Sequence, residues 1–220
     1  IDYAAKIFGR DSKKGIGIDV SPEKVTAMTK SGYQGFVADV LELRLTVTVR
    51  FVIMSHFLEH LGGFPMAQKA LASASKISRE FFYVQQPYFD MDGYLLERGL
   101  KFFWSDWHGH TYAMHSLELY RILRYLLQNG DIARFALYLS GPINSTDDSM
   151  LIPLEAPPDQ HHFDPKLHTQ KPFVTLPENL GLYKEVRILA TKNTYIDFKA
   201  LENQFSWDKK IFDSYSLKPL

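Results

Sequence analysis

The stretch KKGIGIDVSPEKVTAMTKSGYQGFVADV (13–40) decides the fold class, because it contains a complete strand–helix–strand unit. The apolar run GIGIDV ends at the turn-forming SPEK, a pattern typical of a buried parallel strand that leads into a helix. Ser21 is a natural N-cap and Pro22 fits the first helical position, so we expect a helix that ends at Gly32. The final letters, YQGFVADV, form the next strand. Two strands joined in this way lie parallel in one sheet.

The same alternation continues through the rest of the chain. Further strands are predicted at 50–55, 80–87, 133–141 and 182–191, with helices at 66–78 and 116–130 and a terminal helix in the tail 196–215. Alternating strands and helices favour parallel pairing, whereas two late strands separated by a long excursion favour antiparallel pairing at a sheet edge. We therefore predict a single α/β domain over residues 1–220. Its fold class is a Rossmann-like doubly wound sheet, mostly parallel with an antiparallel edge pair, in a three-layer sandwich.

Two segments interrupt this pattern. Residues 88–115 are rich in aromatic and charged side chains, and we expect them to form a lid over the ends of the strands. Residues 142–181 are rich in Pro, Asp and His and are predicted to be a long loop between the last two strands. Residues 1–9 have the spacing of the later part of a helix, so we expect the first strand of the domain and the loop after it to precede this sequence.

Composition excludes several classes of protein. The chain has 25 basic and 25 acidic side chains, which gives no reason to expect nucleic acid or an anionic membrane as a partner. It has no cysteine, so thiol chemistry and thiolate metal sites are excluded. No apolar run approaches the roughly 20 residues of a membrane span. We therefore expect a soluble, cytoplasmic protein that acts on a small molecule.

Doubly wound sheets bind ligands at the carboxyl ends of their strands, so the residues there are candidates for a ligand site. They are Asp19 with Val20, Asp39 with Val40, and Ser55 with His56. A carboxylate at the end of the second strand offers two acceptors to a ribose diol, which suits Asp19. An acidic residue followed by an apolar one can contact an adenine ring. The alternative for both aspartates is a local cap or turn.

These residues occur in an order that resembles a known family. GIDVSPEKV, then ADV twenty residues later, then a strand that ends in SHFLEHL, resembles the class I S-adenosylmethionine-dependent methyltransferases, and in particular the small-molecule enzymes with LEHL after the fourth strand. The resemblance implies that S-adenosylmethionine is the cofactor and S-adenosylhomocysteine the product. It also implies that Asp19, Val20, Asp39, Val40, Ser55 and His56 bind the cofactor. The family's glycine-rich loop does not occur in the sequence, and we expect it before residue 1.

The later stretch HGHTYAMHSLELYRILRYLLQNG (108–130) also resembles the family pattern of a histidine, an aromatic residue and a helix that ends before glycine. The resemblance makes His110 the candidate catalytic residue, as a general base or as a group that orients the acceptor. The candidate substrate-binding residues are Trp104, Trp107, His108 and Tyr112. Alternatively, these side chains form a hydrophobic cluster beneath a long loop.

The octapeptide MSHFLEHL (54–61) contains HFLEH, which matches the H-x-x-E-H pattern of one class of zinc peptidases. That chemistry needs a helix with both histidines on one face, but the preceding residues form a strand and two glycines follow. A second metal hypothesis is that His56, Glu59 and His60 imitate the Glu-x-x-Glu-His ligands of some methyltransferases. We predict no metal: Ser55 and His56 line the cofactor site, while Glu59 and His60 orient the loop.

The sequence therefore predicts a methyltransferase that moves the methyl group of S-adenosylmethionine to a small-molecule acceptor. One alternative is a methyltransferase-like binding protein without catalytic activity. The other is an NAD-dependent oxidoreductase, because Asp19 would also suit an NAD ribose.

Overall fold

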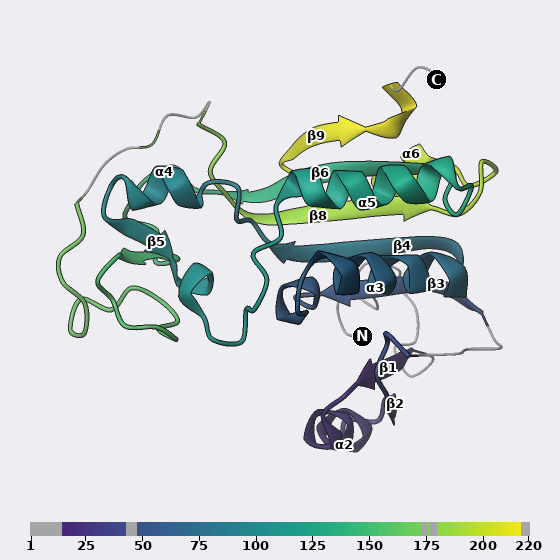
Figure 1. The fold of residues 1–220 in the computed structure, drawn as a ribbon, viewed down its shortest axis with the longest axis horizontal. Coiled ribbons are helices and arrows are strands. Elements are labelled where there is room, and N and C mark those ends of the chain that lie inside the picture. Colours follow the sequence, from purple (N-terminus) through teal and green to yellow (C-terminus); the bar gives the residue numbers. More distant parts are fainter. Residues whose placement is uncertain (1–14, 43–47, 173–175, 177–179, 217–220) are drawn as a thin grey trace.

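The computed structural model of the chain describes residues 15–42, 48–172, 176 and 180–216, and the helix expected in residues 1–9 lies outside them. Figure 1 shows the elements. The strands are β1 (Ile16–Asp19), β2 (Gln34–Val37), β3 (Val49–Ser55), β4 (Ser78–Pro87), β5 (Leu100–Phe102), β6 (Arg134–Pro142), β7 (Leu151–Pro153), β8 (Tyr183–Thr191) and β9 (Lys209–Asp213). The helices are α2 (Pro22–Lys30), α3 (Phe64–Ile77), α4 (Asp92–Leu96), α5 (Ser116–Gln128) and α6 (Phe198–Glu202), with short 3₁₀ turns η2 (Leu58–His60), η3 (Phe103–Asp106) and η5 (Ser214–Ser216).

The strand–helix–strand unit of residues 16–37 forms as predicted. Strands β1 and β2 pair in parallel, and the Ser21 side chain caps α2 by accepting a hydrogen bond from the Lys24 amide at 3.2 Å. Gly32 adopts φ +87° after the helix, a conformation that glycine allows at little cost. Within the described residues, however, these two strands form their own sheet and pair with no strand of the main sheet.

The main sheet has five strands in the order β3-β4-β8-β6-β9. Only β3 and β4 pair in parallel, while β4–β8, β8–β6 and β6–β9 are antiparallel. The sheet is therefore mixed, and the prediction of a mostly parallel sheet was wrong for the described strands. The predicted antiparallel pairing of β6 and β8 is confirmed, but β8 lies inside the sheet and β9 occupies the edge.

Strand β9 replaces most of the terminal helix expected in the tail. Only residues 198–202 are helical, and 209–213 pair with β6. The reason is packing: the ring of Phe212 lies 5.3 Å from that of Phe135 and 5.0 Å from that of Tyr120, which places the tail's apolar side chain on the core beside α5. Burial of this aromatic ring outweighs the helical spacing of the tail.

Side chains cover both faces of the main sheet. Helices α3 and α5 lie side by side on one face (Figure 1), and their apolar stripes form the larger core with Phe82, Leu137 and Ile188. The other face is covered by α6 and the turn after it, through Phe198, Leu201 and Phe205. The molecule is thus a Rossmann-like α/β sandwich in three layers, with a thin second helical layer.

A small lobe lies beyond the carboxyl ends of β3 and β4 (Figure 1). It combines residues 88–115 with residues 142–182, because β5 pairs antiparallel with β7. Its apolar core takes side chains from both segments, namely Phe89, Leu95, Leu100, Phe102, Trp104, Ile143, Leu151, Leu176 and Leu182. The second segment, predicted to be a loop, is therefore half of a folded unit.

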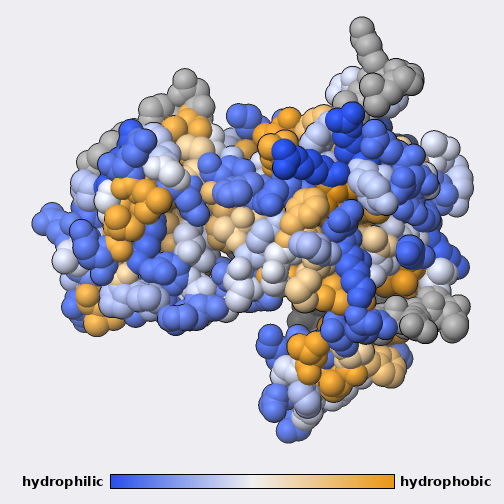
Figure 2. All heavy atoms as spheres, in the orientation of Figure 1, coloured by the Kyte–Doolittle hydropathy of each residue, from blue (hydrophilic) through white to orange (hydrophobic). Residues whose placement is uncertain are grey.

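The surface mixes polar and apolar side chains, but apolar atoms gather over the β1–α2–β2 unit at the bottom of Figure 2. The exposed apolar residues of this unit are Ile16, Val20, Phe36 and Val37. A two-stranded sheet leaves such side chains in solvent because it has no neighbouring strands on which to pack. Among the described residues, no helix has the length and apolar character needed to cross a membrane.

Candidate functional site

Polar side chains converge at the edge of the sheet where β3 and β4 end and the antiparallel β8 begins. The Gln85 side-chain amide donates to Glu185 Oε1 at 2.7 Å, and Arg187 Nη2 donates to Glu185 Oε2 at 2.6 Å. The ring of His56 approaches the same carboxylate, with Nε2 3.4 Å from Oε1. Gln85 of β4 is the register partner of Arg187 in β8, and Glu185 lies two residues before Arg187 in the same strand, so the strand pairing brings these groups together.

His56 occupies a strained position at the end of β3. Its φ is +50°, in the left-handed region that a residue with a side chain enters at a cost of roughly 1 to 3 kcal/mol. Its pKa is raised to about 9 by the carboxylates of Glu185 and Glu59, and burial only partly opposes this. His56 is therefore an imidazolium near neutral pH. Burial alone would raise the pKa of Glu185, but His56 and Arg187 lower it overall.

Glu59 is the most unusual polar residue of the site. It belongs to η2, directly after the end of β3, and it is fully buried at 0% exposure. Neither of its carboxylate oxygens has a hydrogen-bond partner within the described part of the chain. The nearest cation is His56, whose Nδ1 lies 3.4 Å from Oε1 in an ion pair that lacks hydrogen-bond geometry. A buried carboxylate without donors is costly, so its environment calls for a compensating positive charge.

The lobe contacts η2 through the segment 109–112. The Tyr112 amide donates to the Glu59 carbonyl at 3.1 Å, and Thr111 Oγ1 donates to the Leu61 carbonyl at 2.8 Å. His60 Nδ1 lies 2.7 Å from the Gly109 carbonyl oxygen. This ladder fixes the lobe segment against the end of β3.

The ladder also brings His110 to Glu59 and His60. His110 Nδ1 lies 2.9 Å from the Trp104 carbonyl oxygen, and its ring centroid is 5.0 Å from that of His60. A carbonyl oxygen only accepts, so Nδ1 of each ring carries a proton, and the atom through which either ring could bind a ligand is Nε2. Burial lowers the pKa of His110, which favours the neutral ring. One ligand atom from each of Glu59, His60 and His110 lies within 4.8 Å of those of the other two.

The predicted cofactor-binding aspartates form local turns in the structure. Asp19 Oδ1 accepts from the Ser21 amide at 2.8 Å, and Asp39 Oδ1 accepts from the Leu41 amide at 2.8 Å. Each turn uses one carboxylate oxygen, so the local turn that was the alternative role for both aspartates is present. It leaves the second oxygen of Asp39 without a hydrogen bond within the described chain, while Asp19 Oδ2 faces Lys24 at 3.8 Å.

Three other predicted cofactor-binding residues differ in exposure. Val20 is exposed, Val40 packs partly on the core, and Ser55 is exposed at the end of β3 next to His56. Only Ser55 and His56 belong to the polar group at the end of the main sheet.

The four predicted substrate-binding residues lie apart. Trp104 is 5% exposed and its ring stacks on Phe102 in the lobe core, so it is a packing residue in this structure. His108 pairs with Asp159 on the surface, with Nδ1 2.6 Å from Oδ2.

Tyr112 and Trp107 complete that set. The Tyr112 hydroxyl donates to Glu118 at 2.7 Å, and burial together with this bond raises its pKa. Trp107 is half-buried and its ring lies 6.3 Å from that of His110. The expected single cap is thus divided among the lobe core, the lobe surface and α5, and the ring of Trp107 lies near that of the candidate catalytic residue His110.

The sequence prediction did not include Glu185, and it gave Glu59 an orienting role, with metal ligation beside His56 and His60 as a second hypothesis. Glu185 follows no recognisable motif, and it reaches the site only through antiparallel pairing at the start of β8. For Glu59 a signal existed: HFLEH was recognised as a ligand pattern that needs a third group from elsewhere. In the structure the histidine that approaches Glu59 and His60 is His110, which is 50 residues beyond His60 in the chain.

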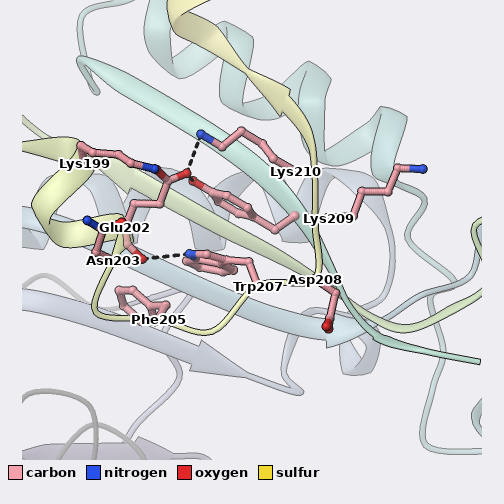
Figure 3. Close-up of a pocket in the computed structure, with 9 residues that line it drawn as sticks. Lys199, Glu202, Asn203, Phe205, Trp207, Asp208, Lys209 and Lys210 are labelled. Atoms are coloured by element: carbon pink, nitrogen blue, oxygen red, sulfur yellow. Dashed lines mark hydrogen bonds and ion pairs between the residues drawn. The ribbon is translucent and has the colours of Figure 1, made fainter.

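A cavity lies away from these residues, between β6, α6 and β9 (Figure 3). It is an open hollow of about 390 Å³. Glu202 lies at its wall, where it accepts from the Tyr138 hydroxyl at 2.6 Å and pairs with Lys199 and Lys210. None of the residues that line it belongs to the candidate site, so the two are separate.

Comparison with known proteins places the fold. No protein-family model and no curated protein sequence matches the chain. Among solved structures, a SAM-dependent methyltransferase from Archaeoglobus fulgidus is 18% identical, with a TM-score of 0.51, and the match covers 80% of this chain and 75% of that one. A SAM-dependent methyltransferase from Thermotoga maritima, described as a possible histamine N-methyltransferase, is 15% identical at a TM-score of 0.51, with 86% and 76% covered.

The plantazolicin methyltransferase BpumL, solved with SAH and a pentazolic desmethylPZN analog, is 13% identical at a TM-score of 0.50 and covers 87% of this chain and 71% of its own. A weaker match is the magnesium protoporphyrin IX methyltransferase from Synechocystis PCC 6803, at 12% identity and a TM-score of 0.46; the match covers 81% of this chain but only 64% of that protein's length. At such identities the likeness concerns the fold. The chain has the α/β fold of SAM-dependent methyltransferases.

Proposed function

We propose that the protein is an enzyme that transfers a methyl group from S-adenosylmethionine to a small-molecule acceptor. The observation that carries the proposal is the fold likeness to three SAM-dependent methyltransferases, one of them solved with SAH. Fold alone does not determine function, so the side chains of the site must also suit cofactor binding and methyl transfer.

The strand-end side chains support the proposal by their positions and their chemistry. Asp19 and Ser55 end β1 and β3, and Asp39 follows β2; open α/β sheets bind nucleotides at such strand ends, and these oxygens could accept from ribose and adenine groups. Val20 and Val40 follow the two aspartates and offer apolar contact to the adenine ring. His56, the strained residue after Ser55, completes this set.

Methyl transfer asks little covalent chemistry of the protein, because the sulfonium cofactor is already activated. The protein must align donor and acceptor, exclude water and in some reactions accept a proton. The lobe beyond β3 and β4 suits the first two tasks. His110 is the candidate for holding or deprotonating the acceptor, with Trp107 beside it. The balanced charge of the chain, 25 basic against 25 acidic side chains, favours a small acceptor over nucleic acid.

Calorimetric titration of the full-length protein with S-adenosylhomocysteine and, separately, with NAD tests the proposal. We expect one molecule of S-adenosylhomocysteine to bind per chain and NAD to bind at least about tenfold more weakly, a difference of about 1.4 kcal/mol. Tighter binding of NAD would favour the oxidoreductase. Binding of S-adenosylhomocysteine without methyl transfer to any of a panel of small amines, phenols and carboxylates would favour a binding protein without activity.

A further inference from the structure

The strongest unexplained feature of the molecule is the buried Glu59 carboxylate. It has 0% exposure, and both oxygens lack hydrogen-bond donors within the described residues. The ion-pair partner that Glu59 has among the described residues, His56, lies at 3.4 Å and is shared at the same distance with Glu185. Because His56 is partly exposed and also pairs with Glu185, it compensates only weakly for the charge of the fully buried Glu59 carboxylate.

Two imidazole rings next to this carboxylate make the kind of hydrogen bond that metal-binding histidines usually make. His60 and His110 each direct Nδ1 at a backbone carbonyl, of Gly109 and Trp104 respectively, at 2.7 and 2.9 Å. Metal-bound histidines usually make this bond, because it fixes the tautomer and orients the ring while Nε2 keeps its lone pair.

The distances between the three groups suit a metal ion after a small adjustment. Their ligand atoms lie within 4.8 Å of one another. Around a tetrahedral zinc ion, ligand atoms about 2.0 to 2.2 Å from the metal lie roughly 3.4 Å apart, so the groups would close by at most about 1.5 Å. Rotation of the Glu59 carboxyl group, whose oxygens make no hydrogen bond within the described residues, would supply part of this movement.

We propose that Glu59, His60 and His110 form a binding site for one divalent transition-metal ion, with zinc as the best fit. Two imidazoles and one carboxylate are a ligand set that zinc and its neighbours accept, and they leave one or more positions open to water or another ligand. Ligands come from both η2 and the lobe, so the ion would join the lobe to the end of β3. This inference rests on the geometry of the three side chains and does not depend on the methyltransferase assignment.

The proposal differs from the earlier prediction that HFLEH binds no metal, and it uses a different third ligand. The sequence hypothesis required His56 and His60 to converge. The structure instead combines Glu59 and His60 with His110, and His56 pairs with the two carboxylates. A metal ion on His110 would take the lone pair that a general base needs, so the two roles of this residue exclude each other.

Titration of metal-free, full-length protein with Co²⁺ tests the site, because cobalt reports its ligands through visible absorption. We expect one Co²⁺ per chain, displaced by one Zn²⁺, with no cofactor added. His60→Ala and His110→Ala should each weaken binding by more than about 100-fold, since even changes behind the ligands cost roughly 10- to 100-fold. His162→Ala, which removes an exposed histidine of the same lobe, should leave the affinity unchanged.

Circular dichroism measures separately whether each variant folds. His60→Ala should disturb folding least, because His60 lies at the surface. Absence of saturable Co²⁺ binding to the wild-type protein would overturn the proposal. So would binding that survives both His60→Ala and His110→Ala, or binding lost on His162→Ala, because exposed histidines would then be the ligands. Failure to bind S-adenosylhomocysteine would leave these results intact and would count against the proposed function alone.

Discussion

At the residue scale, the local hydrogen bonds of Asp19 and Asp39 decide how their carboxylates can meet a ligand. Asp19 and Asp39 each spend one oxygen on a turn two residues ahead, which fixes the carboxylate relative to the strand end. A fixed carboxylate is a better acceptor for a ligand than a mobile one, because less conformational entropy is lost on binding. The turn and the ribose contact are therefore compatible roles.

Asp19→Ala should weaken binding of S-adenosylhomocysteine by about 10- to 100-fold, because hydrogen bonds to a charged group contribute roughly 1.5 to 3 kcal/mol. The measurement is calorimetric titration of full-length protein. Asp147→Ala removes an exposed aspartate of the lobe and serves as the matched control, with no change expected. An unchanged affinity in Asp19→Ala would remove this residue from the site and leave only its turn.

At the element scale, the buried Glu202 holds α6 and β9 to the sheet. Its side chain is 4% exposed and bonds to Tyr138 of β6, Lys199 of α6 and Lys210 of β9. Burial alone would raise its pKa, but these three partners lower it to about 2. A folded-state pKa below the unfolded value means that the contribution to stability is present above about pH 4.5 and is lost as the pH falls toward 2.

Glu202→Gln should therefore lower the free energy of unfolding at pH 7 by about 1 to 3 kcal/mol, since it replaces charge-assisted bonds with neutral ones. The loss should be smaller at about pH 3, where part of the wild-type contribution has already gone. Urea unfolding at the two pH values measures both quantities. Glu97→Gln, at an exposed residue of the lobe, is the control. Equal losses at the two pH values would show that the charge of Glu202 is not what stabilises these elements.

The lobe is the second element-scale unit, because neither of its two chain segments has an apolar core of its own. Leu151 of β7 is 0% exposed and packs in the core that the other segment completes. Leu151→Ala should destabilise the lobe by about 2 to 4 kcal/mol through the cavity it leaves. Hydrogen exchange should then speed up in β5 and β7 and stay unchanged in β4.

Leu154→Ala is the matched control, because Leu154 is three residues away and 39% exposed. It should leave exchange in both regions unchanged. If Leu151→Ala speeds exchange in β4 by the same factor as in β5, the lobe and the main sheet unfold as one unit and the description of a separate lobe is wrong.

At the scale of the whole molecule, the elements most accessible to sequence reasoning were those whose pattern is local. The strands at 16–19, 34–37, 49–55 and 78–87 and the helices between them follow from apolar runs and from caps such as Ser21. Strand β9 and the pairing of β5 with β7 do not, because they depend on partners 75 and about 50 residues distant in the chain. Periodicity within a window carries no information about such contacts.

The residues of the candidate site also divide into those that a local sequence pattern indicates and those that depend on distant parts of the chain. Ser55 and His56 were found because they end a recognisable strand, whereas Glu185 was missed because it begins one. The burial of Trp104 could not be anticipated, since an aromatic residue in an irregular segment is equally compatible with a lid and a core. His110 was selected from a family pattern, and the structure adds the neighbours, Glu59 and His60, that suggest a different use for it.

The central claim is that S-adenosylmethionine binds at the carboxyl ends of β1, β2 and β3. Ultraviolet cross-linking of full-length protein to methyl-labelled S-adenosylmethionine, followed by mapping of the labelled peptide, tests it most directly. The account predicts label within residues 19–25, 38–42 or 55–61, and predicts that excess S-adenosylhomocysteine prevents labelling. Label within residues 199–210, beside the cavity at Glu202, or labelling that S-adenosylhomocysteine does not reduce, would contradict it.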